Sequence, residues 1–140
     1  MDKIITDVSI LHQVSGITTL EEVRRLDLYT RLKNAMPYAW IQGLGLAAIQ
    51  IGVPLRYAWF KGDKYEGELI NPEIIGRIGK AKVKEGCLSV PHQWFWVERA
   101  QMIEYVSDGK AYKCKGIKAQ LIQHEVDHMN GILVSDIGVK

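Results

Sequence analysis

Apolar side chains between residues 19 and 37 recur at a spacing that is typical of a helix. Pro37 ends this repeat, because proline cannot continue a helix. Thr19 and Glu22 have the spacing of a capping box, in which a hydroxyl and a carboxylate each satisfy a free backbone N–H. The pattern therefore predicts one N-terminal helix that begins near Thr19. Its apolar positions are Leu20, Val23, Leu26, Leu32 and Ala35.

After residue 45 the pattern changes to short stretches that favour β-strands. Residues 55–60 are rich in bulky side chains, residues 80–83 alternate, and residues 97–106 are apolar with interspersed charges. Asp108 and Gly109 separate residues 102–106 from 110–113, and both favour the positive φ of a tight turn. We expect a β-hairpin at this turn.

A second helix is predicted from about Ile117 to Asn130, and Gly131 provides its stop. A helix with apolar residues over so much of its surface lies in the interior of a protein. The sequence therefore predicts an α+β fold, with antiparallel β-sheets packed around this central helix. One stripe of the helix contains Ile117, Leu121, His124 and His128, and the adjoining stripe contains Ala119, Ile122, Val126 and Met129.

The composition fits an ordinary globular protein. The chain has 140 residues, 47% apolar and 24% charged, which predicts a single domain over residues 1–140. A net charge of +2 is too small to predict a nucleic acid or a membrane as a partner. Residues 1–10 lack the apolar stretch of a secretory signal, and no run approaches the roughly 18 apolar residues of a membrane span. We therefore expect a cytoplasmic protein.

The predicted central helix contains His124-Glu125-Val126-Asp127-His128. Histidines four residues apart project from one helix face, so both imidazoles can bind one metal ion, and Glu125 can accept a proton from a water on that ion. The alternative is a pair of histidines in solvent or in a polar pocket of the core. We interpret Asp127 as a residue that supports the site or lies on the helix surface.

A catalytic metal site usually takes three protein ligands and a water. No histidine, glutamate or cysteine follows His128, so the third ligand is expected upstream. Cys87, in Glu85-Gly86-Cys87-Leu88-Ser89, is the natural candidate. Cys114 is the competitor, although a half-buried strand residue accounts for it more simply.

Three segments together resemble the peptide deformylase family. They are residues 43–50 (Gly-Leu-Gly-Leu-Ala-Ala-Ile-Gln), residues 85–89 and residues 123–128 (Gln-His-Glu-Val-Asp-His), in the order and at spacings similar to those of the family. The resemblance extends over residues 20–133. It implies an enzyme that hydrolyses the N-formyl group from N-formylmethionyl nascent peptides and releases formate.

The resemblance also implies roles for the site residues. Cys87, His124 and His128 would hold one divalent ion, commonly Fe²⁺, which Zn²⁺, Ni²⁺ or Co²⁺ can replace. Glu125 would act as the general base and then protonate the leaving amine. The side-chain amide of Gln50 and the backbone N–H of Leu88 would stabilise the negative charge that develops on the formyl oxygen.

Substrate binding is expected along the glycine-rich segment, where an extended peptide can add as a strand. The residues that the resemblance assigns to substrate binding are Gly43, Leu44, Gly45, Glu85, Gly86, Ile117 and Leu121. Leu44, Ile117, Gln120, Leu121 and His124 are expected to face the methionine pocket, although an apolar residue is expected in place of Gln120.

The chain departs from the family pattern at several positions. Ile49 replaces the usual proline, so packing is expected to hold Gln50. Trp94 replaces a common arginine and is predicted either to lie in the core or to contact apolar substrate residues. Residues 131–140 are too few for the C-terminal helix of bacterial members, so ribosome association is not expected. The trimmed form resembles bacteriophage-encoded members.

Two other functions would use the same residues. A zinc endopeptidase shares the helix motif, but it usually has a ligand downstream of His128. A non-catalytic module that binds formylmethionyl chains usually lacks a ligand or the base, whereas this chain has all of them. Hydrolysis of the formyl group is therefore the favoured prediction.

Overall fold

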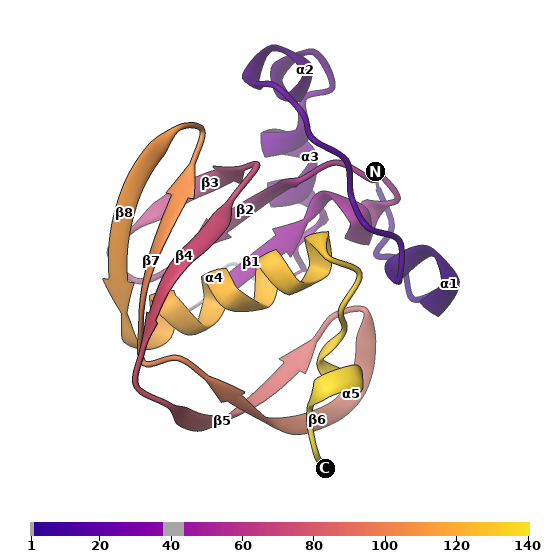
Figure 1. The fold of residues 1–140 in the computed structure, drawn as a ribbon. Helices are drawn as coiled ribbons and strands as arrows, with labels where there is room; N and C mark the ends of the chain where they lie inside the picture. The colour runs from indigo at the N-terminus through magenta and orange to yellow at the C-terminus, as the bar shows by residue number, and fades with distance from the viewer. Residues whose placement is uncertain (1, 38–43) are drawn as a thin grey trace.

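The computed structural model describes residues 2–37 and 44–140. Short helices precede the strands, and one long helix follows them (Figure 1). In chain order the elements are α1 (Val8–Leu11), α2 (Leu20–Arg25), α3 (Leu28–Ala35), β1 (Leu44–Ala47), the 3-10 helix η1 (Ala48–Ile51), β2 (Tyr57–Lys61), β3 (Glu66–Ile70), β4 (Glu73–Ile78), β5 (Ala81–Cys87), β6 (Val90–Arg99), β7 (Met102–Ser107), β8 (Lys110–Lys115), α4 (Gly116–Met129) and α5 (Val134–Ile137).

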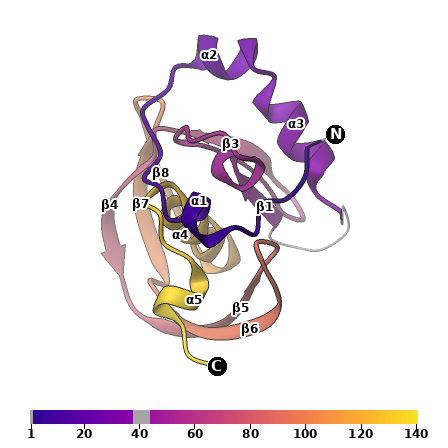
Figure 2. The ribbon, with the colours of Figure 1, turned by 90° about the vertical axis from the view of Figure 1, so that its right-hand side faces the viewer.

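The strands form three antiparallel sheets, in the orders β1-β2-β3, β4-β7-β8 and β5-β6. Helix α4 runs between them, with β4, β7 and β8 on one side and the β5-β6 hairpin below it in Figure 1. In Figure 2 the view runs along α4, and α1 and α5 lie in front of the helix. The predicted α+β fold with a central helix is confirmed.

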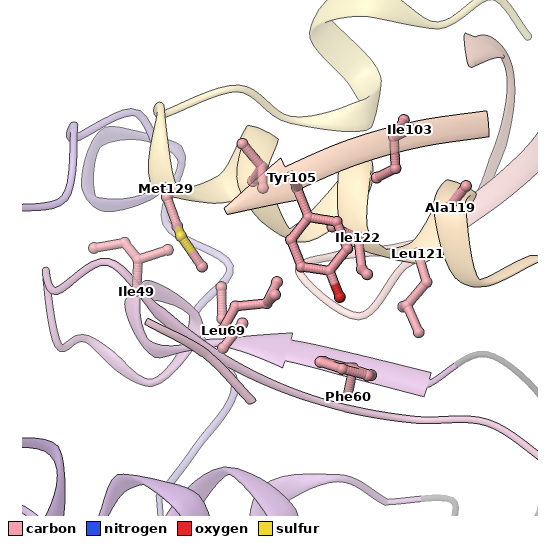
Figure 3. Packing of buried hydrophobic residues seen from close by; sticks show 12 residues of the cluster. Ile49, Phe60, Leu69, Ile103, Tyr105, Ala119, Leu121, Ile122 and Met129 are labelled. Atoms are coloured by element: carbon pink, nitrogen blue, oxygen red, sulfur yellow. The ribbon is translucent and has the colours of Figure 1, made fainter. Parts of the chain in front are cut away.

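The interior position of α4 follows from its apolar stripe. Ala119, Ile122 and Met129 are completely buried, and they pack between β7 and the sheet that contains β2 (Figure 3). Ile103 and Tyr105 of β7 contribute the side of this cluster that faces the β4-β7-β8 sheet. Because the core surrounds α4, its histidines occupy a fixed position in the molecule.

The predicted N-terminal helix is in fact two short helices, α2 and α3. Asp27 interrupts the helix with a left-handed backbone, at φ 55°. The buried side chains explain the break: Val23 and Leu28 are both fully buried but five positions apart, which a continuous helix would not place on one face. A further helix, α1, was not predicted.

Two local predictions for the strands had different outcomes. The hairpin turn is confirmed, with φ of 49° at Asp108 and 77° at Gly109. Residues 97–106 are not one strand, because β6 ends at Arg99 and β7 begins at Met102. In the part of the chain that the structure describes, no helix has the length and apolar character needed to span a bilayer.

Candidate active site

Three potential metal ligands converge where β5 ends beside α4. His124 and His128 are one helical turn apart, and their Nε2 atoms are separated by 3.2 Å. Cys87 is the last residue of β5, and its Sγ lies 3.4 Å from Nε2 of His128. The three donor atoms all lie within 4.8 Å of one another. Tetrahedral coordination with bonds of about 2.0–2.3 Å separates ligands by roughly 3.3–3.7 Å, so this spacing suits one ion.

The surrounding hydrogen bonds also fit a metal centre. Nδ1 of His124 lies 2.9 Å from Oε1 of Glu85, so the imidazole donates its Nδ1–H to the carboxylate and keeps the Nε2 lone pair for a metal. One thiolate with two imidazoles is a donor set that suits several divalent transition metals. The residues present therefore fit the ion that the motif implies.

Arg99 fixes the position of Glu85, the carboxylate that contacts His124. Its guanidinium donates to both oxygens of Glu85, at 2.8 and 2.7 Å, and to Oδ2 of Asp127 at 2.6 Å. Arg99 and Glu85 are 6% and 5% exposed. Burial raises the pKa of Glu85, but the hydrogen bonds from Arg99 and His124 outweigh it and lower that pKa to about 2. The carboxylate is therefore ionised and can orient His124.

The sequence prediction missed Arg99, although the pattern contains a signal for it. In β6 the inward-facing positions are Phe95, Val97 and Arg99, all buried. An arginine at an inward position of a strand requires a buried anion, and Glu85 on the paired strand β5 supplies it.

Glu125 lies beside the ligands and is almost fully buried, at 1% exposed. Burial raises the pKa of its carboxyl to about 7, with a smaller contribution from the negative charge of Glu85. A general base is most effective when its pKa is near the working pH. Gly45 provides the space for this carboxylate, because a Cβ at Gly45 would lie 2.4 Å from Oε2 of Glu125.

Gln50 and Leu88 place two donors near Cys87. The Gln50 side chain is 2% exposed, its Oε1 accepts the backbone N–H of Ala47 at 3.0 Å, and its Nε2 is 3.7 Å from Sγ of Cys87. Nε2 also donates to the hydroxyl of Ser89 at 3.1 Å. Leu88 lies in the turn between β5 and β6, and its N–H donates to no other group in residues 2–37 and 44–140. The sequence analysis gave Ser89 no role.

The residues predicted to bind substrate have different surroundings. Gly43 lies outside the described residues. Leu44 and Gly45 belong to β1, which pairs with β2 along one edge and ends its sheet. Leu121 is 7% exposed, whereas Ile117 is 53% exposed at the start of α4. A Cβ at Gly86 would lie 2.9 Å from the ring of Trp94.

Glu85, which was also predicted to bind substrate, is buried among charged partners. Both of its oxygens accept hydrogen bonds from Arg99, and one is shared with His124. A buried carboxylate with these partners can orient a metal ligand, and its assignment to substrate binding stays a prediction.

The burial of Ile49 and the exposure of Trp94 show how the chain accommodates its departures from the family pattern. Ile49 is 1% exposed and packs in the core cluster around α4, so packing holds the segment that contains Gln50. Trp94 is 60% exposed, and Trp96 is 50% exposed. Burial of Trp94 in the core is therefore excluded. Cys114 is a half-buried residue of β8 that packs against the core cluster, as expected.

Comparison with known proteins tests the resemblance over the whole chain. The model of the family described as polypeptide deformylase matches residues 2–138. The chain belongs to this family. A peptide deformylase of Dictyoglomus thermophilum is 44% identical over 103 residues, which cover 70% of this chain and 67% of that protein. The chain is accordingly a metal-dependent hydrolase that removes the N-formyl group from nascent peptides.

Solved structures share the fold along nearly the whole chain. A probable peptide deformylase from Synechococcus phage S-SSM7 is 32% identical with a TM-score of 0.85, covering 98% of this chain and 99% of that one. The enzyme from Acinetobacter baumannii, in a form bound to Met-Ala-Ser, is 26% identical with a TM-score of 0.81, covering 96% of each chain. Phage proteins are thus among its structural relatives.

Proposed function

We propose that the chain hydrolyses N-formylmethionyl peptides at the site formed by β1, β5 and α4, with Cys87, His124 and His128 as the ligands of Fe²⁺. The observation that supports this proposal is the convergence of these three donor atoms within 4.8 Å beside the buried carboxylate of Glu125. When bound, a divalent ion supplies Lewis acidity and lowers the pKa of a water molecule.

Glu125 moves the proton. Its carboxylate accepts a proton from the attacking water, and the resulting carboxylic acid delivers that proton to the amine that leaves when the C–N bond breaks. Burial and a pKa of about 7 suit both directions of transfer near neutral pH. Oε1 of Glu125 is buried and has no hydrogen-bond partner among the described residues, so the carboxylate keeps free acceptor capacity for the water.

Gln50 and Leu88 stabilise the developing negative charge on the formyl oxygen. The donors beside Cys87 are the Gln50 amide, whose nitrogen makes a long 3.7 Å contact with Sγ of Cys87 that a substrate oxygen can replace, and the backbone N–H of Leu88. Donors that are already oriented cost no reorganisation during the reaction, and the loss of one such donor typically costs about 2.7–4 kcal/mol.

The peptide substrate binds along the free edge of β1. Leu44 and Gly45 offer backbone groups for strand pairing, and the side chain of methionine lies toward Leu121 and Ile117 of α4. Gly86 of β5 is a further proposed contact of the substrate. Because nascent chains are the source of formylmethionyl ends, we place the reaction in the cytoplasm of a bacterial cell.

The test is formate release from formyl-Met-Ala-Ser by protein prepared anaerobically and loaded in parallel with Fe²⁺, Zn²⁺ and Ni²⁺. We expect formate with at least one ion, the fastest release with Fe²⁺, and none after chelation or in Glu125→Ala. Formate from the Glu125→Ala protein would remove the proposed base. Cleavage of an unformylated peptide would instead indicate an endopeptidase, and no formate from folded, metal-loaded protein would indicate a binding module.

A further inference from the structure

The orientation of the Gln50 amide is determined at its oxygen. Oε1 accepts the backbone N–H of Ala47 at 3.0 Å, which leaves the nitrogen to face the opposite side, toward Cys87. An amide oxygen accepts and an amide nitrogen donates, so this bond distinguishes the two ends of the side chain. Gln50 is 2% exposed, so water does not compete for these positions.

A second contact determines the direction of the amide hydrogens. Nε2 donates one of its two N–H groups to Oγ of Ser89 at 3.1 Å, and Ser89 is 3% exposed. The two N–H groups of a primary amide lie in one plane at a fixed angle. With the oxygen and one hydrogen held, the second N–H points toward the metal ligands, where Nε2 donates to Sγ of Cys87 over a long 3.7 Å contact.

We infer that Ser89 is a positioning residue, which acts by aiming the second N–H of Gln50, the one on the side of Cys87, at the formyl oxygen. The inference rests on the proposed function of Gln50. Ser89 lies in the two-residue turn between Cys87 and Val90, next to Leu88. Cys87 and the two turn residues that follow it therefore provide a metal ligand, one backbone donor and the hydroxyl that orients the other donor, so their relative positions are set together.

Replacing Ser89 with alanine removes the acceptor at 3.1 Å, so the plane of the Gln50 amide is held mainly by the bond from Ala47 to its oxygen and can tilt about that contact. We expect Ser89→Ala to lower kcat by roughly 10-fold or more. This loss is smaller than the about 10²–10³-fold loss that follows removal of an oxyanion donor itself, because the amide is still present. KM is expected to change less than about 2-fold, because the contact acts in the transition state. Ser89→Thr keeps the hydroxyl and is expected to retain most of kcat. An unchanged kcat in Ser89→Ala would overturn the inference.

The decisive experiment is a double-mutant cycle with Gln50→Ala. If Ser89 acts through the amide, Ser89→Ala has almost no further effect on kcat once the amide is absent. The same fold-loss in both backgrounds would show that Ser89 acts independently of Gln50 and would contradict the inference.

Ser107→Ala is the matched control. Ser107 is 5% exposed, and its hydroxyl accepts the backbone N–H of Ile70 at 2.9 Å, away from the site. The Ser107→Ala variant therefore loses a comparable buried hydrogen bond, and we expect it to have a lower thermal midpoint of unfolding and an unchanged kcat. A fall in kcat equal to that of Ser89→Ala would reduce the effect of Ser89 to general stability.

A readout that needs no turnover separates this inference from the proposed function. In wild type, the Gln50 side-chain amide should give two well-dispersed, slowly exchanging NMR signals, and Ser89→Ala should shift them and speed their exchange with water. If Ser89→Ala does not fold, Ser89→Thr and Ser89→Cys are compared, because Cys is a weak acceptor of similar size. Unchanged Gln50 signals contradict the positioning role, whereas absent formate release by wild type contradicts the function.

Discussion

Two of the carboxylate–arginine pairs in this protein have contrasting surroundings. In the active site, Glu85 and Arg99 are 5% and 6% exposed and form two hydrogen bonds. At the edge of the β1-β2-β3 sheet, Glu68 of β3 pairs with Arg24 of α2, and these are 23% and 51% exposed. Glu68 also accepts a hydrogen bond from the hydroxyl of Tyr57 at 2.5 Å.

A second carboxylate extends the edge network. Glu66 accepts hydrogen bonds from Tyr29 and Lys33 of α3 and from the indole of Trp59, and so ties this helix to the sheet. We refer to Glu66 and Glu68 with these partners as the helix clamp. Water can replace a lost partner in the helix clamp, whereas Glu85 is only 5% exposed and would be left a poorly solvated charge. The same pairing therefore stabilises a surface contact in one region and a proposed metal ligand in the other.

The largest expected effect is at Glu85. Glu85→Ala leaves Arg99 as a buried charge with only Asp127 as its partner, and it frees the Nδ1 of His124. We expect a loss of about 3–5 kcal/mol in the free energy of unfolding and a roughly 10–100-fold weaker affinity for metal. Urea unfolding and competition with a fluorescent chelator measure the two effects. Wild-type metal affinity in the folded variant would contradict the proposed support of His124.

The active site also lacks spare volume, which Gly45→Ala tests. The added Cβ would lie 2.4 Å from Oε2 of Glu125 and 2.9 Å from Leu121. Because the carboxylate must move, we expect formate release to fall by about 10²-fold or more, the range associated with a misplaced general base. Gly76→Ala is the control, since its nearest neighbour would be at 3.6 Å and its activity should persist. Full activity of Gly45→Ala would show that the Glu125 carboxylate does not need this position for the reaction.

A smaller effect is expected in the helix clamp. Glu68→Gln keeps the size of the side chain and removes the charge that faces Arg24. Since Arg24 is half exposed, we expect a loss of about 0–1 kcal/mol in the free energy of unfolding. Formate release at saturating substrate should equal that of wild type. A loss as large as that of Glu85→Ala would remove the contrast between the two regions.

The smallest effect concerns pH and Glu66. Hydrogen bonds from Tyr29, Trp59 and Lys33 lower the pKa of Glu66 from 4.5 to about 2. The unfolded chain therefore binds a proton more readily, and the stabilisation is complete above pH 4.5 and is lost as pH falls toward 2. We expect Glu66→Gln to lose less stability than wild type between pH 6 and pH 3 in urea unfolding. Equal losses would show that Glu66 is not held in this way.

Several elements were predictable because their signals are local. The hairpin at Asp108 and Gly109 follows from backbone preferences at two positions, and α4 follows from its continuous apolar stripe. The interruption at Asp27 was not predictable in the same way. It depends on which side chains of α2 and α3 become buried against the sheet, and a helical repeat read along the chain does not contain that information.

The sequence by itself determined the family, the α+β fold class and the identity of the donors in its three motifs, because residue types at fixed spacings specify chemistry. Only the tertiary structure decided which buried group each of them meets. It brought Arg99 behind Glu85 and Ser89 against Gln50, and it turned Trp94 toward solvent. These contacts join β5, β6 and η1, and they form because buried polar atoms must find partners when the sheets close around α4.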